Sequence, residues 1–158
     1  MSAITYRLAT AADTQLLIDY RMLLLDYVSK TSHTADVVQK LRDDLAVYFP
    51  KAINDGSYIA WLAYDGDAIA AASGMAIYER PASYNCPTGK VGYILNIYTN
   101  EQYRRQGIST RLMAKLYQSA KDLNVSTLSL HASPDGIGVY RRFGFNEPGN
   151  PVLEMKVV

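Results

Sequence analysis

The stretch YTNEQYRRQGIST, residues 98–110, leads from a β-rich run through a short turn into a helical pattern. The first backbone N–H groups of a helix have no partner within the helix and lie at the positive end of its dipole, so they can bind an anion. Gly107 has no Cβ and lets a phosphate approach the backbone closely. Arg104 and Arg105 add positive charge. The stretch therefore predicts a phosphate-binding turn, with an ordinary turn carrying two solvated arginines as the alternative.

Two common phosphate motifs are absent from the chain. It contains neither G-x-x-x-x-G-K-[ST] nor G-x-G-x-x-G, so it lacks the glycines of a P-loop or of a Rossmann unit. The hydroxyls of Ser109 and Thr110 are the further donors that this turn offers to a phosphate.

Outward from this turn, hydrophobic periodicity predicts elements in the order β-α-α-β-β-β-α-β-α-β-β. Strands that adjoin without a helix indicate antiparallel pairing, and the later β-α-β unit indicates a parallel pair. We expect a single domain over residues 1–158 of the α/β class, an α+β arrangement with one twisted mixed sheet and a helix on each side. The expected strands lie at 4–8, 58–64, 68–78, 91–99, 127–130 and around 153–157, and the expected helices begin at about residues 10, 35, 109 and 133.

Local signals mark several element ends in the first half of the chain. Thr10 and Asp13 match a capping box at the start of the first helix. The pair Asp65-Gly66 is a strong hairpin signal. Pro50 should kink the second helix or start a new turn, because proline cannot donate the hydrogen bond that a helix interior requires.

The C-terminal part has signals of its own. Ser133 is a plausible N-cap for the last helix, Pro134 fits its first position, and Gly144 supplies the left-handed residue that closes it. Apolar residues then alternate, which predicts a closing strand. The alternating residues are Leu153, Met155 and Val157.

Composition excludes several classes of protein. A net charge of +1 provides no basic field for nucleic acid. No segment approaches the ~20 apolar residues that span a bilayer, and the first residues carry no signal-peptide run. The one cysteine, Cys86, cannot form an internal disulfide, and we interpret it as a bystander because no base lies near it in the sequence. We expect a cytoplasmic protein without metal, membrane or nucleic-acid partner.

Two motifs resemble a known family. Arg104-x-x-Gly107-x-Ser109 is similar to the Q/R-x-x-G-x-G/A signature of the GNAT N-acetyltransferases, and residues 131–145 resemble their late Y-x-x-x-G-F element, with Tyr140 as its tyrosine. The element order also matches that family over essentially the whole chain. The resemblance implies the GNAT fold, in which the fourth and fifth strands splay apart and helices flank both faces of the sheet.

The resemblance also implies acetyl-CoA as acyl donor. The backbone of residues 102–110 would hold the pyrophosphate, and the end of the preceding strand would pair with the pantetheine arm in a slot beside residues 128–131. Ser109 replaces the usual glycine or alanine, and Ser133 stands where many relatives carry asparagine. The implied cofactor-binding residues are Ile97, Tyr98, Thr99, Arg104, Arg105, Gln106, Gly107, Ile108, Ser109, Thr110 and Ser133.

Acetyl transfer to an amine requires a neutral amine, a stabilised oxyanion and a proton for the leaving thiolate. Tyr140 is the expected proton donor, and packing against Gly136 and Phe143 is its alternative role. The resemblance places a backbone N–H near Ile97 or Tyr98 at the oxyanion. The general base remains open between three candidates, namely His131, Glu79 and a chain of water molecules.

The acceptor site has a weaker signal. The chain has 13 tyrosines. Tyr78, Tyr84 and Tyr93 are candidates for an aromatic wall that binds a cation or ring, although most strand tyrosines only fill half-buried surface.

These inferences combine into one functional hypothesis. We expect an N-acetyltransferase that moves the acetyl group from acetyl-CoA to a primary amine of a small molecule or peptide, by direct attack in a ternary complex. The alternatives are acetylation of protein N-termini or lysines, and a non-catalytic acyl-CoA sensor with the same fold. The closing strands could also support a homodimer through an exposed edge.

Overall fold

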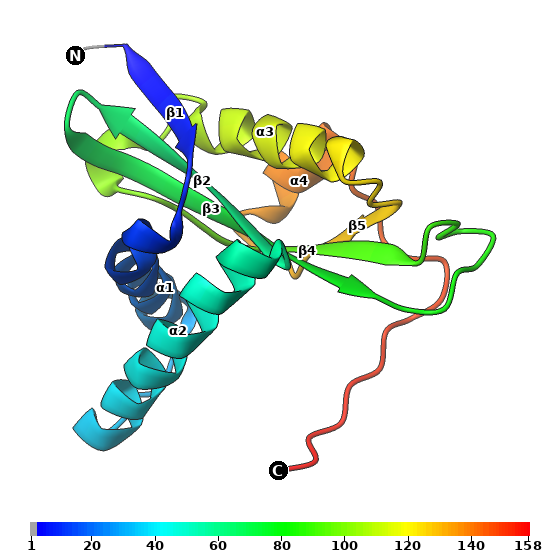
Figure 1. Cartoon of the computed structure of the whole chain (residues 1–158), viewed down its shortest axis with the longest axis horizontal. Helices are drawn as coiled ribbons and strands as arrows, with labels where there is room; N and C mark the ends of the chain where they lie inside the picture. Colours follow the sequence, from blue (N-terminus) through cyan, green and yellow to red (C-terminus); the bar gives the residue numbers. More distant parts are fainter. Residues whose placement is uncertain (1–2) are drawn as a thin grey trace.

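The computed structural model describes residues 3–158, so the first two residues of the expected domain lie outside the described residues. One sheet with the strand order β1-β2-β3-β4-β5 forms the centre, and helices cover both of its faces (Figure 1). The strands are β1 Ile4–Leu8, β2 Tyr58–Asp65, β3 Ala68–Glu79, β4 Lys90–Thr99 and β5 Thr127–Ser129. The helices are α1 Thr14–Val28, α2 Ala35–Asp55, α3 Ile108–Asp122 and α4 Ile137–Phe143, with short 3-10 turns η1 Ala11–Asp13 and η2 Glu101–Tyr103.

Strand pairing follows the predicted pattern. The pairs β1–β2, β2–β3 and β3–β4 are antiparallel, and β4–β5 is parallel because α3 carries the chain back across the sheet. Gly66, with φ +60°, closes the hairpin between β2 and β3. The mixed α/β class and the antiparallel and parallel pairs expected from the sequence are therefore confirmed.

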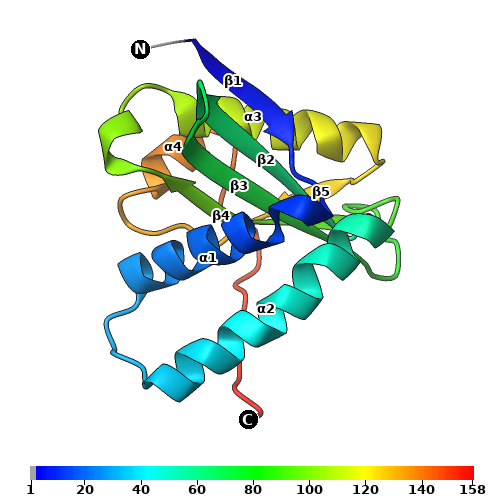
Figure 2. The ribbon, with the colours of Figure 1, turned by 60° about the vertical axis from the view of Figure 1, so that its left-hand side comes forward.

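Side chains of β2 point alternately to the two faces of the sheet and so contact both helical layers. Successive strand residues point to opposite faces, so Tyr58, Ala60 and Leu62 pack with α1 and α2. Trp61 and Ala63 face the layer of α3, and Trp61 Nε1 donates a hydrogen bond to Ser119 Oγ of that helix at 3.0 Å. Figure 2 shows α1 and α2 together on one side of the sheet.

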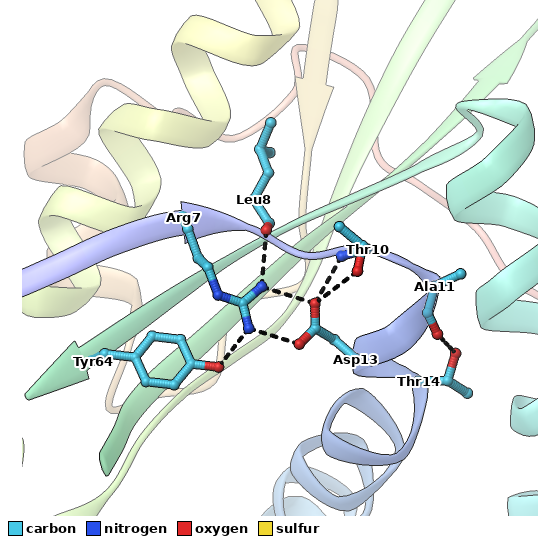
Figure 3. A network of polar contacts seen from close by, with 7 residues as sticks. All are labelled: Arg7, Leu8, Thr10, Ala11, Asp13, Thr14 and Tyr64. Carbon is cyan, nitrogen blue, oxygen red and sulfur yellow. Dashed lines mark hydrogen bonds and ion pairs between the residues drawn. The ribbon is translucent and has the colours of Figure 1, made fainter. Parts of the chain in front are cut away.

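The start of α1 is fixed by a polar network (Figure 3). The Thr10 N–H donates to Asp13 Oδ2 at 2.8 Å, as the capping box predicts. Arg7 of β1 donates to both oxygens of Asp13, at 2.8 and 2.7 Å, and to the Tyr64 hydroxyl of β2 at 2.8 Å. The network therefore joins two strands to the first helical layer.

Helix α2 runs through Pro50 to Asp55, and the kink or new turn expected at the proline stays a prediction. The expected start of the last helix is wrong in detail. Helix α4 begins at Ile137 and not at Ser133, because the Gly136 and Ile137 N–H groups are used in a turn that closes on Ser133. Gly144, with φ +117°, ends α4 as expected.

The expected closing strand does not form within this chain. Residues 144–158 contain no strand, and the end of the chain leads away from the sheet (Figure 1). A period of two identifies the apolar face of a strand but not its partner, and here no neighbouring strand meets it. Its apolar side chains are exposed, namely Val152, Leu153, Met155, Val157 and Val158.

Candidate active site

A cavity of about 570 Å³ opens where β4 and β5 separate. The two strands pair only over Val91–Tyr93 and Thr127–Ser129. Beyond this point β4 continues to Thr99, so its edge toward β5 has no strand partner. The cavity walls are β4, the segment 130–136, Tyr140 of α4 and the inner side of α1. The splay between the fourth and fifth strands that the resemblance implies is therefore present.

Tyr140 lies on the cavity wall next to Gly136. A Cβ at position 136 would meet the Tyr140 ring at 3.1 Å, so glycine allows the ring to lie close to the turn. The ring also packs edge-on against Phe145, with centroids 6.2 Å apart. Burial raises the pKa of the Tyr140 phenol above its ordinary value. Because no described residue hydrogen-bonds the hydroxyl, its proton is available to a molecule in the cavity.

His131 lies beside Tyr140 on the same wall and contacts two polar groups. Its Nδ1 lies in hydrogen-bond contact with the Tyr93 hydroxyl of β4. Its Nε2 lies 3.3 Å from Glu154 Oε1 of the C-terminal segment. Tyr93 lines the cavity as well, so imidazole and phenol together present a proton-accepting pair to it.

The opposite wall contains a bulge in β4. Asn96 and Ile97 together face Ser73 of β3, and Asn96 adopts a left-handed backbone with φ +60°. A bulge turns a strand locally and re-aims its groups. The Asn96 amide points to the side of α1, where Oδ1 accepts a hydrogen bond from Arg21 Nη1 at 2.8 Å. Of the N–H groups expected at the oxyanion, that of Ile97 lies in this bulge and that of Tyr98 directly follows it.

The phosphate turn lies at the far end of β4. Arg104 Nε donates to the Thr99 carbonyl at 3.1 Å, and its guanidinium lies over the rings of Tyr27 and Tyr98. Arg105 and Gly107 both have left-handed backbones, with φ +61° and +74°.

The first turn of α3 follows this loop directly. No side chain caps its N-terminus, so its first N–H groups remain open to a ligand. The Ile108 side chain is buried in the core, so that residue can offer only its backbone. A Cβ built on Gly107 would meet nothing within 4 Å, which leaves space for a phosphate.

These features fit acetyl-CoA. The unpaired edge of β4 can bind the amides of an extended arm, as an added strand does. Thr99 Oγ1 is buried without a hydrogen-bond partner among residues 3–158 and lies on this edge. The open turn of α3 has the donors that a pyrophosphate requires. Ser133 lines the cavity, but its Oγ accepts the Gly136 N–H at 3.2 Å.

The structure separates the candidates for the other roles. Tyr140, His131 and Tyr93 share the cavity with Ile97, Tyr98, Thr99 and Arg104, whereas residues 105–110 lie outside its lining. Glu79 ends β3 on the surface and does not line the cavity. Tyr78 lines an adjoining groove together with Tyr93, His131 and Tyr140, so Tyr78 and Tyr93 stay candidates for the aromatic wall, whereas Tyr84 is fully exposed. Cys86 is buried, with Sγ 3.2 Å from Ser126 Oγ.

Sequence reasoning missed two residues of the cavity. Asn96 had a readable signal, since it is the one amide side chain between Val91 and Tyr98 in an aromatic and β-branched run. Arg21 had none, because a single arginine in an amphipathic helix is typical of any solvated face. Among the described residues no helix is long and apolar enough to cross a membrane, and no group of His, Cys, Asp or Glu side chains is arranged to hold a metal ion.

Comparison with known proteins identifies the class. The model of the acetyltransferase (GNAT) family matches residues 22–145. The chain therefore belongs to the GNAT acetyltransferase family, which uses acetyl-CoA, and the resemblance seen in the sequence is confirmed. None of the curated proteins compared matches the chain.

Solved structures agree with this assignment. An acetyltransferase of Clostridium acetobutylicum with acetyl-CoA is 28% identical, with a TM-score of 0.88 over 98% of this chain and 97% of that chain. A GCN5-related N-acetyltransferase of Ralstonia eutropha JMP134 is 24% identical, with a TM-score of 0.83 over 97% of this chain and 99% of the other. AAC(6')-Iy, in complex with the bisubstrate analogue CoA-S-monomethyl-acetylneamine, shares the fold at 14% identity, with a TM-score of 0.69 over 99% and 100%.

Proposed function

We propose that this chain transfers the acetyl group of acetyl-CoA to a primary amine of a small molecule or peptide, by direct attack in a ternary complex. One observation carries the proposal: a single cavity holds the protonated phenol of Tyr140 and the imidazole of His131 against the unpaired edge of β4. A module that only bound the cofactor would need the open edge but neither proton-handling group.

Different parts of the cavity bind the cofactor and stabilise the reacting carbonyl. The edge Ile97–Thr99 binds the pantetheine amides, with Ser133 on the facing wall, and the N–H groups after the bulge receive the charge that develops on the carbonyl oxygen. Arg104 and Arg105 neutralise the pyrophosphate, and the backbone of residues 106–110 donates to it. Bound acetyl-CoA supplies the activated acyl group.

Tyr140 donates a proton to the leaving sulfur. The phenol is protonated at neutral pH, and it can donate that proton to a thiolate of somewhat lower basicity as the thioester bond breaks.

His131 is the base that the geometry favours. Glu79 is excluded from the cavity, and the Tyr93 hydroxyl connects the cavity to Nδ1 of His131. If Nε2 donates its hydrogen to Glu154, Nδ1 is the accepting nitrogen. A proton from the acceptor ammonium then passes through Tyr93 to His131.

The direct test is an acetyl-transfer assay over a panel of small amines and peptides, run beside calorimetry with CoA. We expect acetyl-CoA binding together with N-acetylation of at least one small amine or peptide. Binding of CoA without transfer to any amine would reverse the conclusion and leave a sensor. Transfer only to protein N-termini or lysines would show that the acceptor is a protein and not a small molecule or peptide.

We further propose that two chains assemble through their C-terminal segments. The outer edge of β5 pairs with no strand among the described residues, and a groove of about 760 Å³ runs beside it. That groove is lined mostly by apolar side chains, including Val91, Leu128, Leu130 and Phe145. Residues 152–158 present alternating apolar side chains, Leu153, Met155 and Val157, that are exposed among the described residues. Packing of the exposed face Leu153, Met155 and Val157 against the groove of a second copy would cover both surfaces and leave Glu154 beside its own His131.

A further inference from the structure

A positive charge on the cavity wall has no negative partner. Arg21 of α1 lines the cavity, and its Nη1 donates to the side-chain oxygen of Asn96 at 2.8 Å. No carboxylate within residues 3–158 forms an ion pair with Arg21, in contrast to Arg7 and Arg42, which pair with Asp13 and Asp19. The guanidinium is therefore positioned by a neutral amide, and its charge is not compensated by the protein.

The contact that positions Arg21 is built from buried groups. Asn96 is only 5% exposed, and its Nδ2 donates to the Tyr58 hydroxyl at 2.8 Å. Gly74 makes room for that hydroxyl, since a Cβ there would lie 1.9 Å from it. Burial raises the pKa of Tyr58 far above its ordinary value, so this group also remains neutral. Three residues thus fix the guanidinium without cancelling its charge.

The position of Arg21 separates it from the cofactor's phosphates. It is joined to Asn96, whereas Arg104 is joined to Thr99, three residues further along β4. That spacing corresponds to about 10 Å along a strand. The phosphate end has its own arginines, and the arm that follows it toward Asn96 carries no charge. The Arg21 charge is therefore available to a ligand other than the cofactor.

We propose that the acceptor amine carries an anionic group, a carboxylate or a phosphate, that binds the Arg21 guanidinium. This inference rests on the proposed function and adds the acceptor's charge to it. One donor of Arg21 is used by Asn96, which leaves its other N–H groups for an anion. A guanidinium paired with a carboxylate or phosphate makes charge-assisted hydrogen bonds of high directionality. The acceptor is thereby held with its amine on the side of Tyr93 and Tyr140.

The test compares pairs of acceptors that differ only in the anion. One arm uses α-amino acids and dipeptides against their C-terminal carboxamides, and the other uses phosphoethanolamine against ethanolamine. We expect the wild-type protein to acetylate the anionic member of at least one arm with a kcat/KM about 10- to 100-fold higher. The arm that shows the preference identifies the anion. Equal rates within both pairs would overturn the inference while leaving the acetyltransferase activity intact.

Variants assign the preference to the residue. Arg21→Gln should lower kcat/KM for the anionic acceptor by about 10- to 100-fold and leave the neutral acceptor unchanged. Arg21→Lys keeps the positive charge but lacks the planar guanidinium that can donate two parallel hydrogen bonds. It should therefore give an intermediate loss of kcat/KM for the anionic acceptor. Arg142→Gln removes an exposed guanidinium of α4 that does not line the cavity, and it should change neither acceptor. An equal loss on both acceptors in Arg21→Gln would show a structural role only.

A binding readout covers the remaining cases. Titration of the same compounds into the CoA-bound protein requires no turnover, so it decides the inference even if no amine is acetylated. The anionic compounds should bind to the wild type and bind more weakly to Arg21→Lys. If Arg21→Gln does not fold, Arg21→Lys and the wild-type preference decide the question. Equal affinity of wild type and Arg21→Lys for every anion would refute the role of Arg21.

Discussion

Tyr140 illustrates how single residues acquire function from their surroundings. Burial raises its pKa, and Gly136 lets its ring approach the turn before α4. Asp13 shows the opposite shift. The hydrogen bonds from Arg7, strengthened by the Thr10 N–H, lower its pKa to about 2, although partial burial acts against them. The surroundings of Tyr140 thus favour its neutral form, and those of Asp13 favour its ionised form.

The substitution Tyr140→Phe tests the proton donor. It preserves the ring and its packing against Phe145 and removes only the hydroxyl. If the phenol protonates the leaving sulfur, kcat should fall by about 100- to 10,000-fold while CoA affinity stays the same, because the interaction belongs to the transition state. Steady-state kinetics and calorimetry measure the two quantities. Turnover at the wild-type rate, with chemistry rate-limiting, would mean that water supplies the proton.

The Asp13 network predicts a pH-dependent stability (Figure 3). Asp13 has a folded-state pKa of about 2, below the ordinary 3.8. Its stabilisation is therefore fully present above pH ~4 and is lost as the pH falls toward 2. Because the Arg7 side chain is 47% exposed, solvent screens the pair. We expect Asp13→Asn to lower the free energy of unfolding by about 1 kcal/mol at pH 7 and by almost nothing at pH 2.

Urea denaturation across this pH range measures the difference. The control is Asp44→Asn, which breaks the exposed pair with Lys40 and should change stability by less than ~0.5 kcal/mol. A loss in Asp13→Asn that does not vary with pH would contradict the assigned origin of the stabilisation.

At the scale of elements, β4 and α3 supply the two main features of the proposed cofactor site. Strand β4 extends six residues, Ile94–Thr99, beyond its last pair with β5, and these residues have a backbone edge without a strand partner. Helix α3 begins without a side-chain cap directly after two left-handed residues. The edge of β4 lacks a strand partner, and the first turn of α3 lacks hydrogen-bond acceptors. In the proposed complex, the pantetheine amides pair with the edge and the pyrophosphate oxygens accept from the turn.

The element-scale prediction concerns the first turn of α3. Gly107→Trp places a bulky side chain where the backbone should approach the pyrophosphate, so CoA affinity should fall by at least tenfold. The matched control is Gly56→Trp at the end of α2, where the glycine also has a left-handed backbone and open space. Both variants share the strain of a positive φ, but only the first should weaken binding in calorimetry. Unchanged affinity in a folded Gly107→Trp variant would place the site elsewhere.

At the scale of the whole molecule, two surfaces have no partner among the described residues: one edge of the sheet and an apolar segment near the C-terminus. The edge is the outer side of β5, and the segment comprises residues 152–158. Exposed edges and exposed apolar strands favour association with another chain. The cytoplasmic location, the absence of a metal and the assembly itself stay predictions.

The assembly is tested by two substitutions on opposite faces of one segment. Met155→Asp inserts a charge on the apolar face and should convert a dimer into a monomer in light scattering. Lys156→Asp changes the charge on the other face and should leave the dimer intact. A wild-type monomer at high concentration would remove the proposal, as would an equal effect of the two substitutions.

The sequence by itself determined what depends on near neighbours. Capping at Thr10 and Asp13, the Asp65-Gly66 hairpin and the strand-to-helix turn at Gly107 each involve residues within a few positions, so local rules identified them. The family motif then added Tyr140 and the cofactor residues, because a short pattern carried them. The start of α4 depended on a weaker local preference, and that expectation was wrong in detail.

Only the tertiary structure decided what depends on distant parts of the chain. Arg21 and Asn96 are 75 residues apart, and Asn96 and Tyr58 are 38 apart. No local pattern relates such residues, because their contact requires the sheet and the first helical layer to be packed. The prediction of a closing strand was wrong for a related reason. The alternation in residues 153–157 specifies which side chains would share a face. A strand also needs a neighbouring strand edge, and the tertiary fold decides whether one is present.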